Sequence, residues 1–205
     1  MPALWTHPNK LLLASTSATR LALLVSAGLP VETQRSNVDE RAVEDAARGE
    51  KLDPLALARR LAGEKALAVS RLHPDRIVLG ADQVLECDGI VLHKAETQEA
   101  ARAQLRRLSG RSHALHSAGA IAIAGQVVES FTASAHLTMR PLTDDGIDLY
   151  LDIAGSDVLQ SVGVYQIEGP GIHLFETVEG DHSTILGLPL IPLLSALRRL
   201  GCLAF

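Results

Sequence analysis

A single carboxylate, that of Asp82, comes directly after an apolar run at residues 77–79 and the pair Gly80-Ala81. This pattern predicts a buried strand that delivers Asp82 at or near its carboxyl end, where open α/β sheets place their chemistry. A carboxylate in that place can accept a proton from water or hold a divalent metal ion. For an isolated aspartate the capping of a turn is the more common role, so this alternative stays open.

Hydroxyl and guanidinium groups follow the first apolar strand, which we expect at residues 10–14. Ser15 and Ser17 come next, and Arg20 lies about one turn into a helix expected over residues 19–27. A strand, a turn and a helix in this order present free N–H groups to an anion, and arginine can bind two phosphate oxygens at once. The alternative is an N-cap by Ser15 or Ser17 with Arg20 in a solvated salt bridge, and this segment alone does not decide between them.

Glu40 and Lys65 are further charged candidates. Glu40 lies in an acidic loop at residues 37–41, where it either caps the helix expected over residues 42–49 or holds a metal ion. Lys65 lies near the middle of a helix expected over residues 53–69, where a lysine is usually solvated. The sequence by itself decides neither role.

A β-hairpin is predicted by the dipeptide Asp88-Gly89, because it stands between two apolar runs. The return strand, at residues 90–94, would bring Lys94 back towards the level of Asp82.

The second half of the chain carries a similar mixture of strands and helices. We expect long strands at residues 111–124 and 126–140, a shorter one at 174–178, and helices at 97–108, 143–151 and 189–200. The glycine-dense segment 163–171 indicates a tight loop near a ligand. His113, His116 and His136 match no two-histidine metal motif, so we expect structural or surface roles for them.

The bulk composition is that of an ordinary soluble globular protein, with 47% hydrophobic and 21% charged residues. A net charge of −5 argues against a general nucleic-acid or membrane-surface binder, so we expect neither partner. Cys87 and Cys202 are too few for a disulfide framework or a zinc site and suit a reducing cytoplasm. No signal peptide or membrane span is indicated, and 205 residues suffice for one core or for two small lobes that share a cleft.

Several short motifs occur in a fixed order along nearly the whole chain. They are Leu13-Ala14-Ser15-Thr16-Ser17-Ala18-Thr19-Arg20, Val38-Asp39-Glu40, Glu64-Lys65-Ala66, the run GADQV around Asp82, Lys94, Leu108-Ser109-Gly110-Arg111, Tyr165-Gln166-Ile167-Glu168-Gly169, Glu179-Gly180-Asp181 and Gly187-Leu188-Pro189-Leu190. This series resembles the Maf family of nucleoside triphosphate pyrophosphatases. Each motif is weak by itself, and together they are highly specific.

The resemblance implies an α/β fold with a long twisted mixed β-sheet flanked by helices, in two lobes around a central cleft, as in Maf and inosine triphosphatase-like proteins. It implies a single domain over residues 1–205 that forms a homodimer in the cytoplasm. The implied reaction is hydrolysis of a nucleoside triphosphate to a monophosphate and pyrophosphate, which removes nucleotides that should not enter RNA or DNA.

The resemblance also implies a role for each candidate. The expected substrate-binding residues are Ser15, Ser17, Arg20, Gln83 and Glu168. The first three hold the triphosphate, and Glu168 lies near the base or a phosphate.

Three residues are implied in catalysis and two carboxylates in metal binding. Asp82 is the proton acceptor, and Lys65 and Lys94 are cations of the cleft. Glu40 and Asp82 hold a divalent metal ion, Mg²⁺ or Mn²⁺. This set meets the needs of water attack on phosphorus, which requires a base, a divalent cation and positive charge on the leaving pyrophosphate.

Two departures from the family pattern matter, the first for the backbone around Lys94 and the second for the choice of nucleotide. The family usually has Gly-Lys-Pro where this chain has His93-Lys94-Ala95. Gln83 and Glu168 stand where the branch that acts on dTTP and UTP has Thr and Gln, and they look more like the branch that acts on 7-methyl-GTP. Tyr165 and Ile167 look like the dTTP and UTP branch, so that substrate class remains an alternative. Another alternative is a nucleotide-binding regulator of cell division and septum formation that does not need turnover.

Overall fold

The computed structural model describes residues 4–205, which form two compact units. Of these residues, 4–83, 116–134 and 181–205 make up the first unit, and residues 84–115 and 135–180 make up the second. The expectation of a single domain over residues 1–205, with two lobes around a cleft, stays a prediction.

A seven-stranded sheet has the order β2-β1-β3-β5-β6-β7, with β4 paired to β3. The strands are β1 (Leu11–Leu13), β2 (Val31–Thr33), β3 (Val78–Cys87), β4 (Ile90–Leu92), β5 (Ser112–Ile123), β6 (Gln126–Met139) and β7 (Phe175–Glu179). β1 pairs in parallel with β2 and β3, whereas β4 and β7 pair antiparallel with β3 and β6. The predicted mixed sheet is therefore confirmed.

Seven α-helices and two short 3₁₀-helices accompany the strands in residues 4–205. They are α1 (Ala18–Ser26), α2 (Glu40–Gly49), α3 (Pro54–Ser70), α4 (Gln98–Leu108), α5 (Asp144–Ala154), η1 (Ser156–Gln160), η2 (Pro170–Leu174), α6 (His182–Ile185) and α7 (Leu190–Arg199). Asp53 caps α3 and Thr97 caps α4, each by accepting a hydrogen bond from the backbone N–H three residues on. The predicted starts of both helices are confirmed.

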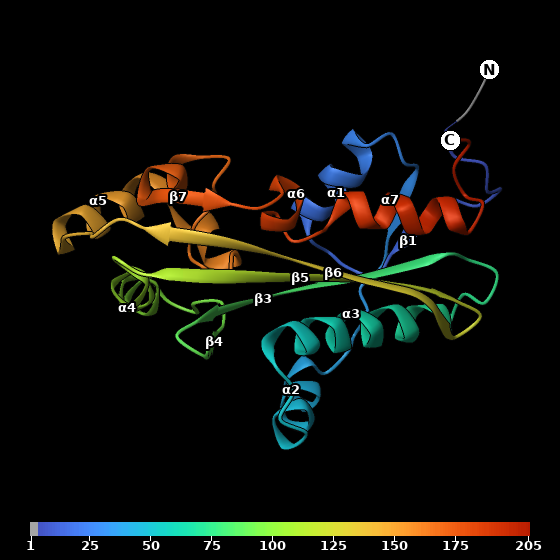
Figure 1. Cartoon of the computed structure of the whole chain (residues 1–205), viewed down its shortest axis with the longest axis horizontal. Helices are drawn as coiled ribbons and strands as arrows, with labels where there is room; N and C mark the ends of the chain where they lie inside the picture. Colours follow the sequence, from blue (N-terminus) through green and yellow to red (C-terminus); the bar gives the residue numbers. More distant parts are fainter. Residues whose placement is uncertain (1–3) are drawn as a thin grey trace. The chain divides into compact units, whose positions relative to one another are not determined.

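The core of the first unit lies on both faces of its sheet, because successive residues of a strand point to opposite faces. Leu13 of β1 is buried in one cluster with Leu24 of α1 and Leu197 of α7. Its neighbour Leu12 is buried in another cluster with Val69 of α3. Accordingly α1 and α7 cover one face and α3 covers the other, as Figure 1 shows. A strand covered on both faces has to be apolar throughout, which explains the run of leucines in β1.

Gly80 lets α3 approach β3 very closely. A Cβ atom at Gly80 would lie only 2.1 Å from the carbonyl oxygen of Ala62 and 2.6 Å from the backbone nitrogen of Ala66. Any larger residue would force the helix away from the strand. The absence of a side chain at Gly80 therefore determines how closely α3 packs on β3 next to Asp82.

Strand β3 is longer than the sequence suggests. We expected Asp82 at or near the carboxyl end of its strand, and this expectation is wrong, because β3 continues to Cys87. Its parallel partner β1 ends at Leu13, which pairs with Leu79. Asp82 therefore lies in the middle of its own strand but beyond the carboxyl end of the neighbouring strand.

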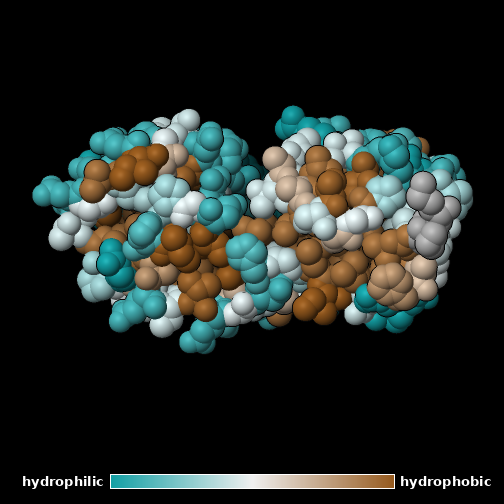
Figure 2. Space-filling model, turned by 90° about the horizontal axis from the view of Figure 1, so that it is seen from above, coloured by the Kyte–Doolittle hydropathy of each residue, from teal (hydrophilic) through white to brown (hydrophobic). Residues whose placement is uncertain are grey.

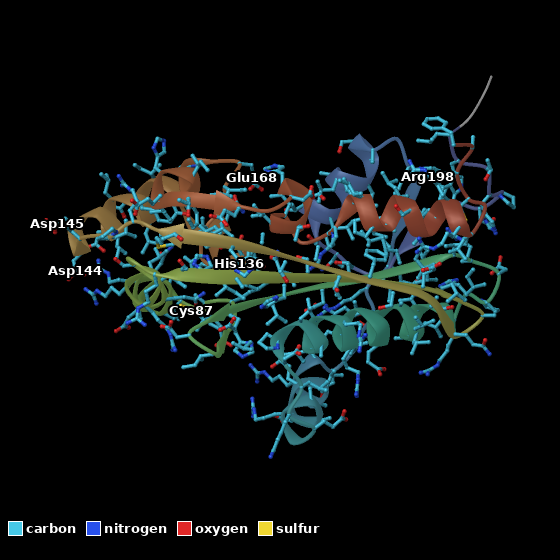
Figure 3. The ribbon with its side chains drawn as sticks, viewed as in Figure 1. Cys87, His136, Asp144, Asp145, Glu168 and Arg198 are labelled. Atoms are coloured by element: carbon cyan, nitrogen blue, oxygen red, sulfur yellow. The ribbon has the colours of Figure 1, made fainter. Side chains whose placement is uncertain are left out.

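In the second unit, β3 and β4 form the predicted hairpin. The turn residues Asp88 and Gly89 have φ angles of 54° and 76°, as a type I′ turn requires. Strand β4 ends at Leu92, before the expected Lys94. Helices α4 and α5 contact each other, and Asp144 at the start of α5 (Figure 3) pairs with Arg106 at 2.7 Å.

A buried aromatic cluster fixes the start of the glycine-dense loop in this unit. The rings of Tyr165 and Phe175 meet edge to face, and Tyr165 Oη lies 2.7 Å from His113 Nε2. Tyr150 Oη donates to the carbonyl of Val164 at 3.1 Å. Val164 has a φ of 59°, a left-handed value that is unusual for a β-branched residue. The loop is thus held in a strained but well-anchored conformation.

Apolar side chains at the surface occur as patches among polar ones on both units (Figure 2). Large apolar residues with high exposure include Ile191 of α7 and Leu149 of α5, which are 69% and 61% exposed. No helix within residues 4–205 is long and apolar enough to cross a membrane.

Candidate active site

The turn between β1 and α1 forms a helix cap. Ser17 Oγ accepts a hydrogen bond from the backbone N–H of Arg20 at 3.3 Å, and the N–H of Ser17 donates to Ser15 Oγ at 3.2 Å. The capping role that the sequence left open is therefore present at Ser17. The first N–H groups of a helix have no intrahelical partner, so the same turn retains the capacity to bind an anion.

Arg20 is held by backbone carbonyl groups. Its Nε donates to the carbonyl of Gly187 at 2.9 Å and its Nη1 to the carbonyl of Ala81 at 3.0 Å. The alternative of a solvated salt bridge is wrong for this residue. Burial lowers the pKa of the Arg20 guanidinium, and the nearby carboxylates of Asp82 and Glu40 raise it. An arginine remains protonated under such influences, so the site has a fixed positive charge.

Lys65 joins two carboxylates. Its Nζ donates to Asp82 Oδ1 at 2.5 Å and lies 2.9 Å from Glu40 Oε1. Lys65 and Asp82 are each only 7% exposed, whereas the side chain of Glu40 is 52% exposed. The solvated position that is usual for a helix lysine does not apply here. One ammonium group thus holds a buried carboxylate and an accessible one together.

Asp82 and Gln83 point to opposite faces of β3, because they are consecutive residues of one strand. Asp82 meets α3, whereas Gln83 Nε2 lies 3.0–3.1 Å from Ser117 Oγ and from the carbonyl oxygens of Thr184 and Ile185. An amide nitrogen has two hydrogens to share among these three acceptors. The nitrogen of Gln83 is therefore engaged by the protein.

A polar cavity of about 540 Å³ lies where β1 and β2 end. Its walls are Ala14, Ser15, Thr16, Arg35, Ser36, Asn37, Val38, Asp39, Glu40 and Lys65. The carboxyl ends of parallel strands are the usual place for a ligand in an α/β sheet. Three predicted site residues, Ser15, Glu40 and Lys65, share this wall.

The donor atoms suit a divalent cation that is held partly by a substrate. Within residues 4–205 no group of three or more His, Cys, Asp or Glu side chains could hold a metal ion by itself. Mg²⁺, however, often takes only one or two protein carboxylates and completes its shell with phosphate oxygens and water. Glu40 and Asp82, which share the Lys65 ammonium, are donors of that kind.

The last two predicted site residues belong to the second unit. Lys94 follows β4. Glu168 is exposed in the loop between η1 and η2 (Figure 3), so its carboxylate is accessible to solvent. Their participation in the site remains a prediction.

The sequence model of the Maf-like protein family matches residues 10–200. The chain belongs to the Maf family. The resemblance inferred from the short motifs is thereby confirmed at the level of the family. Whole-length relatives extend the match. A Maf relative from Nitrobacter winogradskyi, named nucleoside triphosphate pyrophosphatase, is 50% identical over 196 residues, which cover 96% of each chain.

Two further relatives match over a similar length, and one of them carries a different name. One from Rhodopseudomonas palustris (strain BisB18), also named nucleoside triphosphate pyrophosphatase, is 48% identical over 202 residues, 98% of this chain and 99% of the relative. One from Brucella abortus, named 7-methyl-GTP pyrophosphatase, is 45% identical over 194 residues, 95% of this chain and 98% of the relative.

Part of the cavity wall of this Maf chain was missed from the sequence. Arg35 and Asn37 follow β2 and line the cavity, and Asn37 has a left-handed φ of 53°. The signal was present, because residues after a parallel strand tend to face the ligand. It was weak, since β2 has only three residues and its partner is not visible from the sequence.

Proposed function

We propose that this Maf protein hydrolyses nucleoside triphosphates between the α and β phosphates and releases a nucleoside monophosphate and pyrophosphate. The observation that carries the proposal is the Lys65 ammonium, which lies on the wall of a polar cavity at the strand ends and pairs with both Asp82 and Glu40. The predicted enzyme class, a nucleoside triphosphate pyrophosphatase, agrees with the family and with the names of the relatives.

Asp82 is the proposed acceptor of the proton from the attacking water. In the structure its Oδ1 accepts a hydrogen bond from the Lys65 ammonium. An anionic phosphate chain competes with Asp82 for that ammonium. When Lys65 turns to a phosphate oxygen, Oδ1 is released from this hydrogen bond and can orient water and take its proton.

The phosphate chain is held by the turn between β1 and α1. Ser15 lines the cavity, and the Arg20 guanidinium, which donates to Ser15 Oγ at 3.5 Å, stands beside it. The backbone N–H groups at the start of α1 add donors that carry no charge of their own. Lys94 is the further cation that we propose to neutralise the departing pyrophosphate.

Glu40 and Asp82 would hold a divalent cation, Mg²⁺ or Mn²⁺. The ion, when bound, would lower the pKa of water and neutralise phosphate charge. It would also help a chain with a net charge of −5 to bind a polyanion.

For the base we propose 7-methyl-GTP. An exposed carboxylate at Glu168 can accept hydrogen bonds from the N1 and N2 donors of guanine or face the cationic methylated ring. The amide oxygen of Gln83 is a second acceptor. The Brucella abortus relative that is named for this substrate supports the proposal. A preference for dTTP or UTP is the alternative, since Tyr165 and Ile167 look like that branch.

A homodimer in the cytoplasm is a further proposal, which rests on the family resemblance. The second candidate function also rests on the family resemblance. It is a nucleotide-binding regulator of cell division that does not need turnover. The accessible polar cavity would serve binding in either function.

A pyrophosphate-release assay tests the proposed function. The panel would contain 7-methyl-GTP, dTTP, UTP and the common purine nucleotides, each with Mg²⁺ or Mn²⁺. We expect the nucleoside monophosphate and pyrophosphate as the only products, with 7-methyl-GTP turned over fastest. Binding without pyrophosphate release from any nucleotide would favour the regulator.

A further inference from the structure

We infer that Arg35 is an additional phosphate-binding residue of the cavity and contacts the phosphate chain of the nucleotide. The inference deepens the proposed function and rests on it for the identity of the anion. Arg35 belongs to no motif that suggested the family, and its position in the fold is what singles it out.

Three adjacent parallel strands deliver charged or hydroxyl groups to one edge of the sheet. Arg35 follows β2, Ser15 follows β1, and Asp82 lies on β3 beyond the point where β1 ends. Arg35 and Ser15 line the same cavity, to which Lys65 brings the ion pair with Asp82. Arg35 therefore follows the third of three neighbouring strands, and the other two, β1 and β3, already supply candidate residues.

The loop that carries Arg35 is anchored at both ends. On one side the N–H of Gln34 donates to the carbonyl of Leu13 at 2.9 Å, and the Gln34 side chain lies 2.8 Å from His73 Nε2. On the other side Asp39 caps α2 through the N–H of Ala42 at 3.1 Å. The backbone of residue 35 is consequently fixed next to β1, while its side chain is exposed.

The cavity wall carries two carboxylates, those of Asp39 and Glu40, and two cations, Lys65 and Arg35. Lys65 is shared by Asp82 and Glu40, and Arg20 donates to backbone carbonyls. Arg35 is the other cation on the cavity wall. Among residues 4–205 its guanidinium has no ion pair or side-chain hydrogen bond. A planar guanidinium with its donors uncommitted is the group best suited to bind phosphate oxygens in pairs.

The variants Arg35→Ala and Arg35→Lys test this role, with Arg48→Ala as the matched control. Arg48 lies on α2, is paired with Asp45 on the surface and does not line the cavity, so its loss changes the net charge equally. The probe is inorganic tripolyphosphate, whose dissociation constant is measured by calorimetry with and without Mg²⁺. The same variants are assayed for KM and kcat of pyrophosphate release, and their thermal midpoints are compared.

We expect Arg35→Ala to weaken tripolyphosphate binding and raise KM by at least about tenfold, with kcat less affected and the thermal midpoint unchanged. Arg35→Lys should fall between Arg35→Ala and the wild type, and Arg48→Ala should match the wild type. Tripolyphosphate binding that is equal in Arg35→Ala and the wild type overturns the inference, as does a wild type that does not bind the probe. If the wild type releases no pyrophosphate but Arg35→Ala binds tripolyphosphate more weakly, the proposed function fails and the inference stands.

Discussion

Lys65 Nζ lies 2.5 Å from Asp82 Oδ1, and both residues are 7% exposed. The contact joins α3 to the middle of β3, at the place where Gly80 allows the two elements to touch. The carboxylate to which we assign the chemistry is thus also part of the packing of the helix on the sheet. Substitutions at this pair should therefore affect both activity and stability, and each effect can be measured by its own assay.

Asp82→Asn should abolish pyrophosphate release while nucleotide binding persists. An amide accepts no proton at neutral pH and is a poor metal ligand, and loss of a general base costs about 100- to 10,000-fold in rate. Turnover is measured by pyrophosphate release, and binding by calorimetry with a nucleoside triphosphate in Mg²⁺. Asp45→Asn on the exposed face of α2 is the control and should keep full activity. Undiminished turnover in Asp82→Asn would rule out Asp82 as the base.

Lys65→Met should lower the free energy of unfolding by about 3–5 kcal/mol, because it leaves the buried Asp82 carboxylate without its ammonium partner. The double variant Lys65→Met/Asp82→Asn should regain part of this loss, since no buried charge remains. Urea unfolding of the four proteins measures the coupling. Lys10→Met removes an exposed ion pair with Glu32 and should cost no more than about 1 kcal/mol. Strictly additive effects of the two substitutions would contradict the ion-pair argument.

Gly80→Ala should destabilise the protein and impair turnover together. The new Cβ would overlap the backbone of Ala62 and push α3, with Lys65, away from Asp82. Gly63→Ala on α3 is the control, because beyond its own helical backbone and chain neighbours no atom lies within 4 Å of its Cβ position. Replacing that helical glycine should stabilise the protein by up to about 1 kcal/mol. Thermal unfolding and pyrophosphate release are compared for both, and an unaltered Gly80→Ala protein would show that α3 has room to move.

Local features of the fold were predictable from the sequence, because they depend on neighbouring residues. Asp53 and Thr97 cap the helices they were expected to cap, and Asp88-Gly89 makes the expected turn. The chemistry around Asp82 was not predictable in the same way. The surroundings of Asp82 depend on the residue at which the neighbouring strand β1 ends. The end of a paired strand depends on contacts between segments that are distant in the sequence.

Lys65 shows why single residues are difficult to interpret from sequence. A lysine on a helix is usually solvated, and only the close approach of α3 to Gly80 brings this one to a buried carboxylate. Conversely, successive side chains of a strand point to opposite faces of the sheet, so the sequence alone already predicted that Gln83 and Asp82 face opposite sides. The family motifs placed both residues in one site without indicating that they face opposite sides of the sheet.

The stability of the protein should fall as the pH is lowered from about 6.5 to about 4, in part through His113. Burial lowers the pKa of His113 to about 4 from its ordinary value of 6.5. In this window the unfolded chain binds a proton that the folded chain does not, so stability rises with pH and this contribution is complete above pH 6.5. At pH 4 the loss amounts to about 3 kcal/mol.

The variant His113→Gln tests this assignment by urea unfolding at pH 7 and at pH 4.5. It should show a smaller difference between the two conditions than the wild type, even if it is less stable at both. His173→Gln is the control, because His173 is exposed in η2. An unchanged pH dependence in His113→Gln would mean that other groups produce the acid sensitivity.

Glu168→Gln should shift the preference of the enzyme away from 7-methyl-GTP. The carboxylate of Glu168 is exposed at the loop that Val164 and Tyr165 anchor, and it offers only acceptors to a guanine edge or to a cationic ring. An amide replaces one acceptor with a donor, so kcat/KM for 7-methyl-GTP should fall by about tenfold while that for UTP changes little. Glu176→Gln on the exposed part of β7 is the control. A wild type that prefers dTTP or UTP, or a variant with an unchanged ratio, would show that Glu168 does not select the base.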